Sequence, residues 1–292
     1  MRDDSLISLS QIPGPMDTAI VTVYCLADDW LRARRHEESS QRTVTDAEVM
    51  TAAIVAARFF SGNFETALDL LEGPSYFGGR LSRSRFNRRL HALDSVLESF
   101  FEWLGRLHQM ASAEDVFLID SCPVEVCDNI RISRCRIYPK TATDDAYRGY
   151  NSSKRRYFYG LKVHMVTTAE GNPVEVSLTP GSYNDTKHLR TFELDLPEGS
   201  VLYGDKAYNE YFTEDLLAEA SGIELLPHRK KNSKRSVEAY VEYVQQVYRK
   251  KIETGFSGLK RLLPASIHAV TDRGFELKVF LFVLACSIDV LL

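Results

Sequence analysis

Residues 115–120 read Asp-Val-Phe-Leu-Ile-Asp, so four consecutive apolar side chains stand between two acids. A short apolar run bounded by polar residues is typical of a strand that is buried on both faces. The segment therefore predicts a buried strand, and it places the carboxylate of Asp120 where that strand gives way to a loop that begins Ser-Cys-Pro.

A second strand is predicted over residues 157–168, where the side chains alternate between two faces. Lys162 and His164 share one of these faces. A turn at residues 170–172 then joins this strand to a third, over residues 173–179, as a hairpin. Lys162 and His164 either touch phosphate on an active face or are ordinary polar residues of an exposed strand face.

The next elements alternate between strand and helix. Residues 201–205 predict a fourth strand, residues 213–220 a helix, and residues 223–226 a fifth strand. Residues 237–263 carry apolar side chains at helical spacing and predict a long helix. This order predicts an α/β fold with flanking helices.

The first part of the chain shows helical patterns alone. Apolar residues recur at helical spacing over residues 20–31, and Thr45 with Glu48 forms a capping box ahead of another apolar run. We therefore expect an all-helical region over residues 1–110 and an α/β domain over residues 111–292.

A helix–turn–helix is possible near residues 63–93. A short helix follows Asn63, and a second, which Ser82 can cap, carries apolar residues on one side and arginines on much of the rest. Such a motif needs a second helix that presents cations to phosphate and donors to base edges. The cations of this helix are Arg83, Arg85, Arg88 and Arg89.

The composition, with 44% hydrophobic and 26% charged residues, excludes fibrous and disordered classes. The formal net charge is −4, yet nine Lys and Arg against two acids fall within residues 131–162, and ten against three within residues 229–261. Clustered cations can attract a polyanion in spite of the net charge, although each cluster alone also fits a solvated surface. We place basic insertions in the α/β domain at residues 131–156 and 228–236.

The sequence favours a reducing cytoplasm and no membrane. It has five cysteines, an odd number, at irregular spacing, and Asp3 and Asp4 do not fit a secretory signal. The apolar C-terminus, residues 279–292, contains Asp289 and is shorter than the roughly 20 residues that a membrane span needs. It predicts a core helix.

Three acids stand out because each occurs on or beside a predicted regular element. Asp120 and Asp205 end apolar strands, and Glu253 lies on the long helix, with Arg249 and Lys260 along the same face. Carboxylates from distant positions that a rigid sheet brings together are the ligands that Mg²⁺ prefers, and adjacent cations would hold a polyanionic substrate. The alternative is that Arg249 and Glu253 form a surface ion pair and that each acid is a helix cap or solvated.

Three further acids are weaker candidates. Asp185 precedes a predicted helix, where Asp commonly caps, although it could instead contact the residues that hold the metal. Asp144 and Asp145 lie in an irregular stretch that is a poor support for a rigid ligand.

The ordered set of these motifs resembles the DDE transposases of bacterial insertion sequences, and among them the insertion-sequence 982 family. The motifs are Asp120 after its strand, Tyr-Gly-Leu-Lys-Val-His at 159–164, Gly-Asp-Lys-Ala-Tyr at 204–208, and Arg-Lys-Lys-Ile-Glu-Thr-Gly-Phe at 249–256. The resemblance is densest over residues 115–263. One departure is Gln246, which stands where related transposases carry a tyrosine.

The resemblance implies a ribonuclease H-like mixed sheet, preceded by a helical DNA-binding region, and a site with two Mg²⁺ ions, for which Mn²⁺ can substitute. The ligands and catalytic residues would be Asp120, Asp205 and Glu253. The implied activity is cleavage at the terminal inverted repeats of its own element and strand transfer into target DNA, by a bacterial cytoplasmic, nucleoid-associated protein that is a homodimer at synapsis. The residues expected at DNA are Arg83, Arg85, Arg88, Arg89, Arg155, Arg156, Lys162, His164, Lys206, Arg229, Lys230, Lys231, Arg249 and Lys260.

Two rival functions remain open from the sequence. One is a metal-dependent DNA nuclease that cuts without joining, and the other is a domesticated DNA-binding protein without catalysis. Product analysis separates the first from a transposase, because strand transfer leaves joined DNA.

Overall fold

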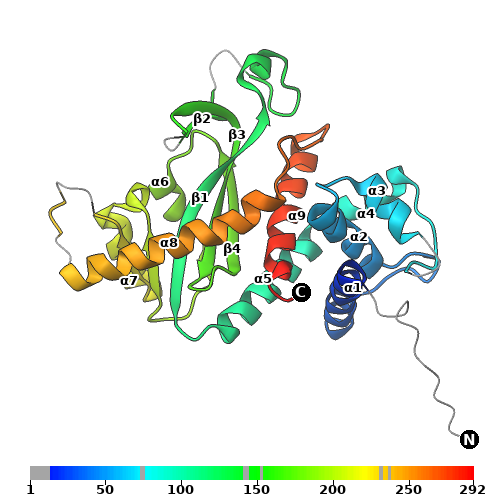
Figure 1. Ribbon diagram of the computed structural model, residues 1–292, viewed down its shortest axis with the longest axis horizontal. Helices are drawn as coiled ribbons and strands as arrows, with labels where there is room; N and C mark the ends of the chain where they lie inside the picture. The colour runs from blue at the N-terminus through cyan, green and yellow to red at the C-terminus, as the bar shows by residue number, and fades with distance from the viewer. Residues whose placement is uncertain (1–13, 73–75, 141–144, 152–153, 230–232, 236–237) are drawn as a thin grey trace, which may run out of the picture. The chain divides into compact units, whose positions relative to one another are not determined.

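The computed structural model describes residues 14–72, 76–140, 145–151, 154–229, 233–235 and 238–292, except for the side chains of residues 252–255 (Figure 1). The chain divides into two compact units. The first is Met1–Phe100 together with Ile288–Leu292, and the second is Phe101–Ser287. The division falls inside a helix, α5 (Asp94–Ala111).

The first unit is built from helices in its described part. They are α1 (Pro15–Ala33), α2 (Asp46–Phe59), α3 (Phe64–Leu71), α4 (Arg83–Ala92) and the start of α5. The expected capping box begins α2, where the Glu48 N–H donates to Thr45 Oγ1 at 3.1 Å and the Thr45 N–H donates to Glu48 Oε2 at 2.5 Å. Asn63 caps α3, because its side-chain oxygen accepts from two N–H groups of the first turn.

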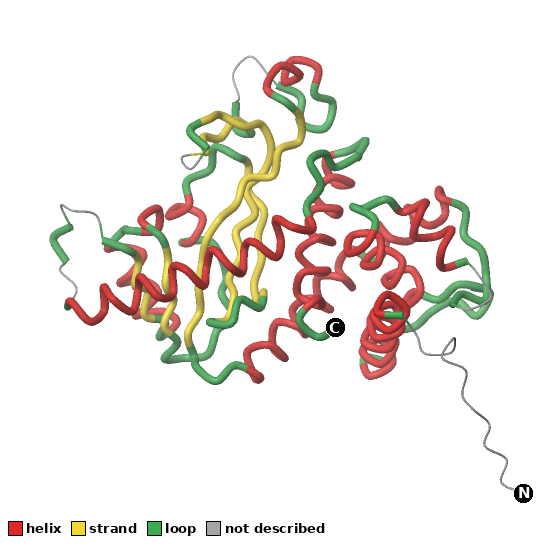
Figure 2. The backbone as a smooth tube through the Cα atoms, in the orientation of Figure 1, coloured by secondary structure: helices red, strands yellow, loops and turns green. Residues whose placement is uncertain are grey.

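The second unit holds a mixed sheet of six strands (Figure 2). Its central strand is β1 (Val116–Cys127), which pairs antiparallel with β3 (Arg156–Thr168), and β3 pairs antiparallel with β4 (Pro173–Pro180). On its other side β1 pairs in parallel with β5 (Val201–Gly204), which pairs in parallel with β6 (Glu224–Pro227). The predicted α/β class with a mixed sheet is therefore confirmed.

The structure corrects the predicted strands in two places. β1 does not end at Asp120 but continues to Cys127, with Pro123 paired to Lys162 of β3. A strand that the sequence did not indicate, β2 (Arg148–Asn151), lies within the predicted basic insertion and pairs with the start of β3.

The helices of the second unit follow the predicted order. After the short helix α6 (Asp185–Leu189) come the 3₁₀ turn η3 (Lys206–Tyr208), α7 (Tyr211–Ser221), α8 (Ala239–Leu262) and α9 (Asp272–Asp289). A 3₁₀ turn, η2 (Asn129–Arg134), follows β1. α8 runs across the sheet and contacts β1 and β5 (Figure 1). Within the described residues, no helix has the length and apolar character to cross a bilayer.

The core of the second unit fixes the centre of the sheet. Phe117 and Ile119 of β1 are buried with Leu202 of β5, and Tyr208 of η3 belongs to the same cluster. Burying such side chains stabilises the fold by about 1.5–3 kcal/mol each. The two parallel strands are therefore held rigidly at the ends where Asp120 and Asp205 follow.

Candidate active site

Two of the predicted acids meet at one edge of the sheet because β1 and β5 are parallel and in register. Ile119 of β1 pairs with Gly204 of β5, so the residues that follow, Asp120 and Asp205, are neighbours although they lie far apart in the chain. β5 ends at Gly204, whereas β1 continues and pairs with β3 alone. The two carboxylates therefore lie at the point where the pairing of β1 with β5 ends. Ligand sites of α/β proteins commonly form at the carboxyl ends of strands at such a point.

Asp120 is half-buried, and its Oδ1 accepts a hydrogen bond from the Ser121 N–H at 2.8 Å. Removal from water raises the pKa of Asp120 to about 7, and repulsion from Asp205 and Asp185 acts in the same direction. The ammonium of Lys260 opposes this rise. Asp120 therefore lies in a weakly hydrated, negatively charged environment that favours a cation.

Asp205 caps the turn that follows β5. Its Oδ1 accepts a hydrogen bond from the Ala207 N–H at 2.6 Å, which fixes the carboxylate at the start of η3. Burial raises the pKa of Asp205 and repulsion from Asp185 adds to the rise, while Arg249 and His228 act against it. Asp205 thus shares the electrostatic environment of Asp120.

Asp185 lies close enough for its charge to act on the same carboxylates, and it is not the cap of its helix. Asn184 caps α6, with its side-chain oxygen accepting from the N–H groups of Thr186 and Lys187. The Asp185 carboxylate instead accepts from Lys162 Nζ at 2.9 Å, and the Ser121 hydroxyl lies 3.5 Å from the same oxygen. The expectation that Asp185 serves as a helix cap is wrong.

A buried polar layer lies beside the acids and was missed by sequence reasoning. Tyr208 is fully buried, and its pKa is raised well above the usual range by burial and by the charges of Asp185, Asp120 and Asp205. His164 Nε2 lies 2.9 Å from Thr179 Oγ1, and its Nδ1 lies 3.5 Å from the Tyr208 hydroxyl. The available signal was Tyr208 itself, which closes the motif that contains Asp205.

His164 is fully buried, so it cannot contact DNA phosphate in this structure, and that prediction is corrected. The face of β3 that carries His164 is covered by Tyr208 and by His188 of α6. The ring centroids of His188 and His164 lie 4.1 Å apart. Burial lowers the pKa of His164 to about 3, and the nearby His188 and Lys162 add to the fall. His164 is therefore a neutral hydrogen-bonding residue of the core.

The long helix α8 brings cations to the acids. The positive charge of Lys260 lowers the pKa of Asp120, and that of Arg249 lowers the pKa of Asp205. Both cations are exposed. Glu253 lies in the same helix between these two residues, but its side chain falls outside the described part of the structure.

The tyrosines near the position of Gln246 differ in their surroundings. Tyr248 stacks on Tyr203 of β5 at 4.8 Å and donates its hydroxyl to Glu114 Oε2 at 2.6 Å. Tyr243 is 69% exposed, and Gln246 is exposed as well.

The arginines of α4 divide into two kinds. Arg85 and Arg88 are exposed, and Arg83 is exposed as well but pairs with Glu65 at 2.8 Å. Arg89 is turned into the first unit, where it donates to the Val44 carbonyl and to Asp46 Oδ1, each at 2.5 Å. The structure gives Arg89 a packing role, unlike the other three.

The cations predicted to reach DNA from the second unit also differ in exposure. Arg155 and Lys206 are exposed, and Arg156 is exposed but pairs with Glu125. Arg229 is enclosed by a bidentate pair with Glu214 at 2.5 and 3.0 Å, so the expectation of a DNA contact is corrected to a structural ion pair. Lys230 and Lys231 lie outside the described residues.

A second group of possible metal ligands occurs in the first unit. His36, Glu38 and Asp46 bring donor atoms within 4.8 Å of one another. Asp46 already accepts from Arg42 at 2.6 Å and from Arg89, and burial alone would raise its pKa, but its hydrogen bonds with His36 and Arg89 hold the pKa below its usual value. Two guanidinium groups thus occupy the place of a cation at this carboxylate.

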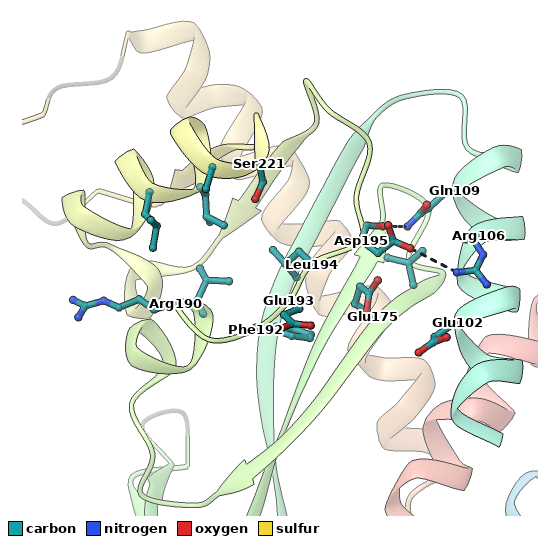
Figure 3. A pocket seen from close by; sticks show the side chains of 15 residues that line it. Glu102, Arg106, Gln109, Glu175, Arg190, Phe192, Glu193, Leu194, Asp195 and Ser221 are labelled. Atoms are coloured by element: carbon teal, nitrogen blue, oxygen red, sulfur yellow. Dashed lines mark hydrogen bonds and ion pairs between the residues drawn. The ribbon is translucent and has the colours of Figure 1, made fainter. Parts of the chain in front are cut away.

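A cavity of about 670 Å³ lies in the second unit between α5, β4 and the segment 189–195 (Figure 3). Glu175 and Asp195 line it, and Arg106 lies 3.6 Å from the Asp195 carboxylate. None of the predicted catalytic acids lines this cavity. The cavity and the two strand-end acids are therefore separate features of the second unit.

Comparison with known proteins agrees with the geometry. A family model described as a transposase DDE domain matches residues 110–268, the region that contains the sheet and α8. A 53-residue stretch is 38% identical to the transposase for insertion sequence element IS1106 of Neisseria meningitidis serogroup B. This match covers only 18% of each chain. No solved structure gave a significant match. Because the family model covers more than half of the chain, the protein belongs to the family of proteins with a transposase DDE domain.

Proposed function

We propose that the protein is a DNA transposase of an insertion sequence. It would cleave a phosphodiester at the ends of its own element and join the freed 3′ hydroxyl to target DNA. The observation that carries the proposal is the parallel register of β1 and β5, which brings Asp120 and Asp205 together at an open strand edge beside cations of α8. In a chain with a transposase DDE domain, this arrangement supports phosphodiester chemistry.

The fold proposal is a ribonuclease H-like domain. β1, β3 and β4 pair antiparallel, and the additional strand β2 pairs with the start of β3. β5 and β6 follow on the other side of β1, parallel to it. This supports the resemblance inferred from the sequence motifs. The helices of the first unit would bind DNA through the exposed Arg85 and Arg88, in a manner that a helix–turn–helix near residues 63–93 would allow.

The donor set fits a divalent cation. Asp120 and Asp205 offer carboxylate oxygens, and burial and repulsion from Asp205 raise the pKa of Asp120, an effect that a bound cation would oppose. We assign Asp120, Asp205 and Glu253 as the residues that would hold Mg²⁺ or Mn²⁺. The family uses divalent metal, and we infer two ions per site. When bound, the metal supplies activation of the attacking oxygen and stabilisation of the leaving oxygen.

The protein's own groups orient the DNA substrate. Lys260 and Arg249 lie close enough to the acids to act on their charge, so each can pair with a phosphate oxygen of a strand held beside them. The Ser121 and Ala207 N–H groups fix one oxygen of Asp120 and of Asp205, leaving the other carboxylate oxygens for the site. A homodimer would bring two element ends together, and the protein would work in the bacterial cytoplasm at the nucleoid.

The test compares end cleavage and end binding for the wild-type protein and for Asp120→Asn and Asp205→Asn. The DNA is taken from the genomic flanks of the chain's own coding sequence. We expect metal-dependent cleavage to fall at least about a hundredfold in both variants, because loss of a carboxylate ligand removes several kcal/mol of transition-state stabilisation. Binding of the DNA ends should remain. Asp215→Asn, which removes an acid of α7 that pairs with Arg235, is the matched control.

Each outcome separates the rival functions. Cleavage without joined product would favour a nuclease, and binding without cleavage in the wild-type protein would favour a DNA-binding protein. A fully active Asp120→Asn variant would contradict the proposed site.

A further inference from the structure

Asp185 and Lys162 form an ion pair near the two strand-end acids. Lys162 Nζ lies 2.9 Å from Asp185 Oδ1 and 2.8 Å from the Tyr183 carbonyl, so the ammonium is fixed by two acceptors. The two side chains are only 17% and 15% exposed. Such a sheltered pair differs from a surface ion pair, which contributes little and is easily separated.

The pair is linked to the strand that carries Asp120. Lys162 is paired in the sheet with Pro123 of β1, and the Ser121 hydroxyl lies 3.5 Å from Asp185 Oδ1. Asp120 and Asp205 both lie within range of the negative charge of Asp185, although Asp185 belongs to neither of their strands.

The local structure does not require Asp185 for the helix that it begins. Asn184 already satisfies the first N–H groups of α6, with distances of 3.0 and 3.2 Å to Thr186 and Lys187. A carboxylate at this position is costly beside two others unless it has a cation as its partner. Helix capping therefore does not account for an acid at this position, close to two others.

We infer that Asp185 is a positioning residue of the proposed active site, and that with Lys162 it sets the charge at the Asp120–Asp205 pair and so controls how tightly that pair takes up a divalent cation. This inference rests on the proposed function. Lys162 holds the Asp185 carboxylate in place and neutralises part of its charge. The proposed site therefore has a third carboxylate nearby without a full additional negative charge. The two partners should then affect the affinity for a divalent cation with opposite signs.

The experiment measures Mn²⁺ binding to the full chain, without DNA, by water-proton relaxation titration. Asp185→Asn should weaken Mn²⁺ binding by about tenfold, the size typical of groups that support metal ligands. Lys162→Met should tighten it by about threefold or more, because a positive charge near the cation is lost. Lys162→Arg keeps the charge and should bind Mn²⁺ as the wild type does.

If the pair had only a structural role, Asp185→Asn and Lys162→Met would change the Mn²⁺ affinity in the same direction, because both break the same ion pair. That result would overturn the inference. Thermal melting of each variant shows whether it is folded. Asp215→Asn removes an acid from a more exposed ion pair, with Arg235 at 2.8 Å, and should leave Mn²⁺ binding unchanged.

Asp120→Asn separates this inference from the proposed function. Loss of Mn²⁺ binding in Asp120→Asn, with unchanged binding in Asp185→Asn, would contradict the role of Asp185 alone. Wild-type protein that does not bind Mn²⁺, or Asp120→Asn that binds it normally, would contradict the proposed metal site itself.

Discussion

At the scale of single residues, small differences in position decide what a side chain can do. Asp120 and Asp205 each follow the last paired residue of two parallel strands, so the backbone fixes both carboxylates before any ligand arrives. Gly204 makes this possible at close range, because a Cβ there would lie 3.2 Å from Ile119 Cγ2 and from the Tyr208 ring. The site thus depends on residues that carry no chemistry.

Gly160 is the clearest case where a side chain would not fit. A Cβ at this position would lie 2.1 Å from the Val124 carbonyl oxygen and 2.9 Å from the Val126 nitrogen, both in β1 next to its register shift. Gly160→Ala should therefore lower the free energy of unfolding by about 2–4 kcal/mol, because the backbone of β1 or β3 must move. Chemical denaturation measures this change.

The matched control for that substitution is Gly78→Ala, because a Cβ at Gly78 would meet nothing within 4 Å. Its effect should stay within about 0.5 kcal/mol. Equal losses for both alanine variants would contradict the packing argument at Gly160.

At the scale of elements, α4 shows that one helix can carry arginines of two kinds. Arg89 contacts the Val44 carbonyl and Asp46, whose side chain is 5% exposed, and so ties α4 to α2. Arg89→Met should lower the free energy of unfolding by about 3 kcal/mol, since it removes a partner from a buried carboxylate. Urea unfolding of the full chain measures the change.

The exposed arginines of α4 should behave in the opposite way. Replacing both Arg85 and Arg88 by alanine should leave stability nearly unchanged and weaken binding to DNA. The slope of log affinity against log salt should fall by about one for each DNA phosphate that the variant no longer neutralises. Fluorescence anisotropy over a range of salt concentrations measures it, and an unchanged slope would remove α4 from the DNA interface.

The strands show where sequence patterns succeed and where they fail. The apolar runs before Asp120 and Asp205 correctly predicted β1 and β5, because strands that are buried on both faces of a sheet have nearly continuous apolar sequences. The run Ser-Cys-Pro hid the continuation of β1, since proline is rare within sheets. It is tolerated at Pro123 because β5 has already ended, and β1 pairs there with β3 alone.

Side-chain partners that are distant in the sequence explain most other differences. Arg229 looked like part of a basic surface, but Glu214 of α7 encloses it, and nothing local in the sequence indicates that pair. The alternation of side chains along the strand predicted which face of the sheet His164 lies on, but it could not indicate that Tyr208 and His188 cover that face. The acids could be selected from the sequence, while their register and the orientation of Asp185 required the structure.

At the scale of the whole molecule, the pH dependence of stability combines groups of opposite sign. Burial lowers the pKa of His164 to about 3, so between pH 6.5 and 3 the unfolded chain binds a proton that the folded protein does not. Stability is therefore lost as the pH falls through this range, by up to about 1.4 kcal/mol per pH unit. Burial raises the pKa of Glu175 to about 7, which acts oppositely and favours the folded state as the pH falls from 7 toward 4.5.

A non-titrating variant isolates the contribution of His164. His164→Asn can still exchange a hydrogen bond with Thr179, so its stability should fall less steeply than that of the wild type below pH 6.5. Denaturation at about pH 7, 6, 5 and 4 gives the two curves. His268→Asn, at an exposed histidine, should follow the wild type, and parallel curves for His164→Asn and the wild type would contradict the burial argument.

The central claim is that Asp120 and Asp205 form the active site of a transposase, and strand transfer tests it most directly. Labelled DNA from the chain's own genomic flanks is incubated with Mn²⁺ and a target plasmid, using wild type, Asp120→Asn, Asp205→Asn, Glu253→Gln and the control Asp215→Asn. We expect metal-dependent 3′-end cleavage and joined product with the wild type and the control, and neither product with the other three variants. Joined product from Asp120→Asn or Asp205→Asn would contradict it.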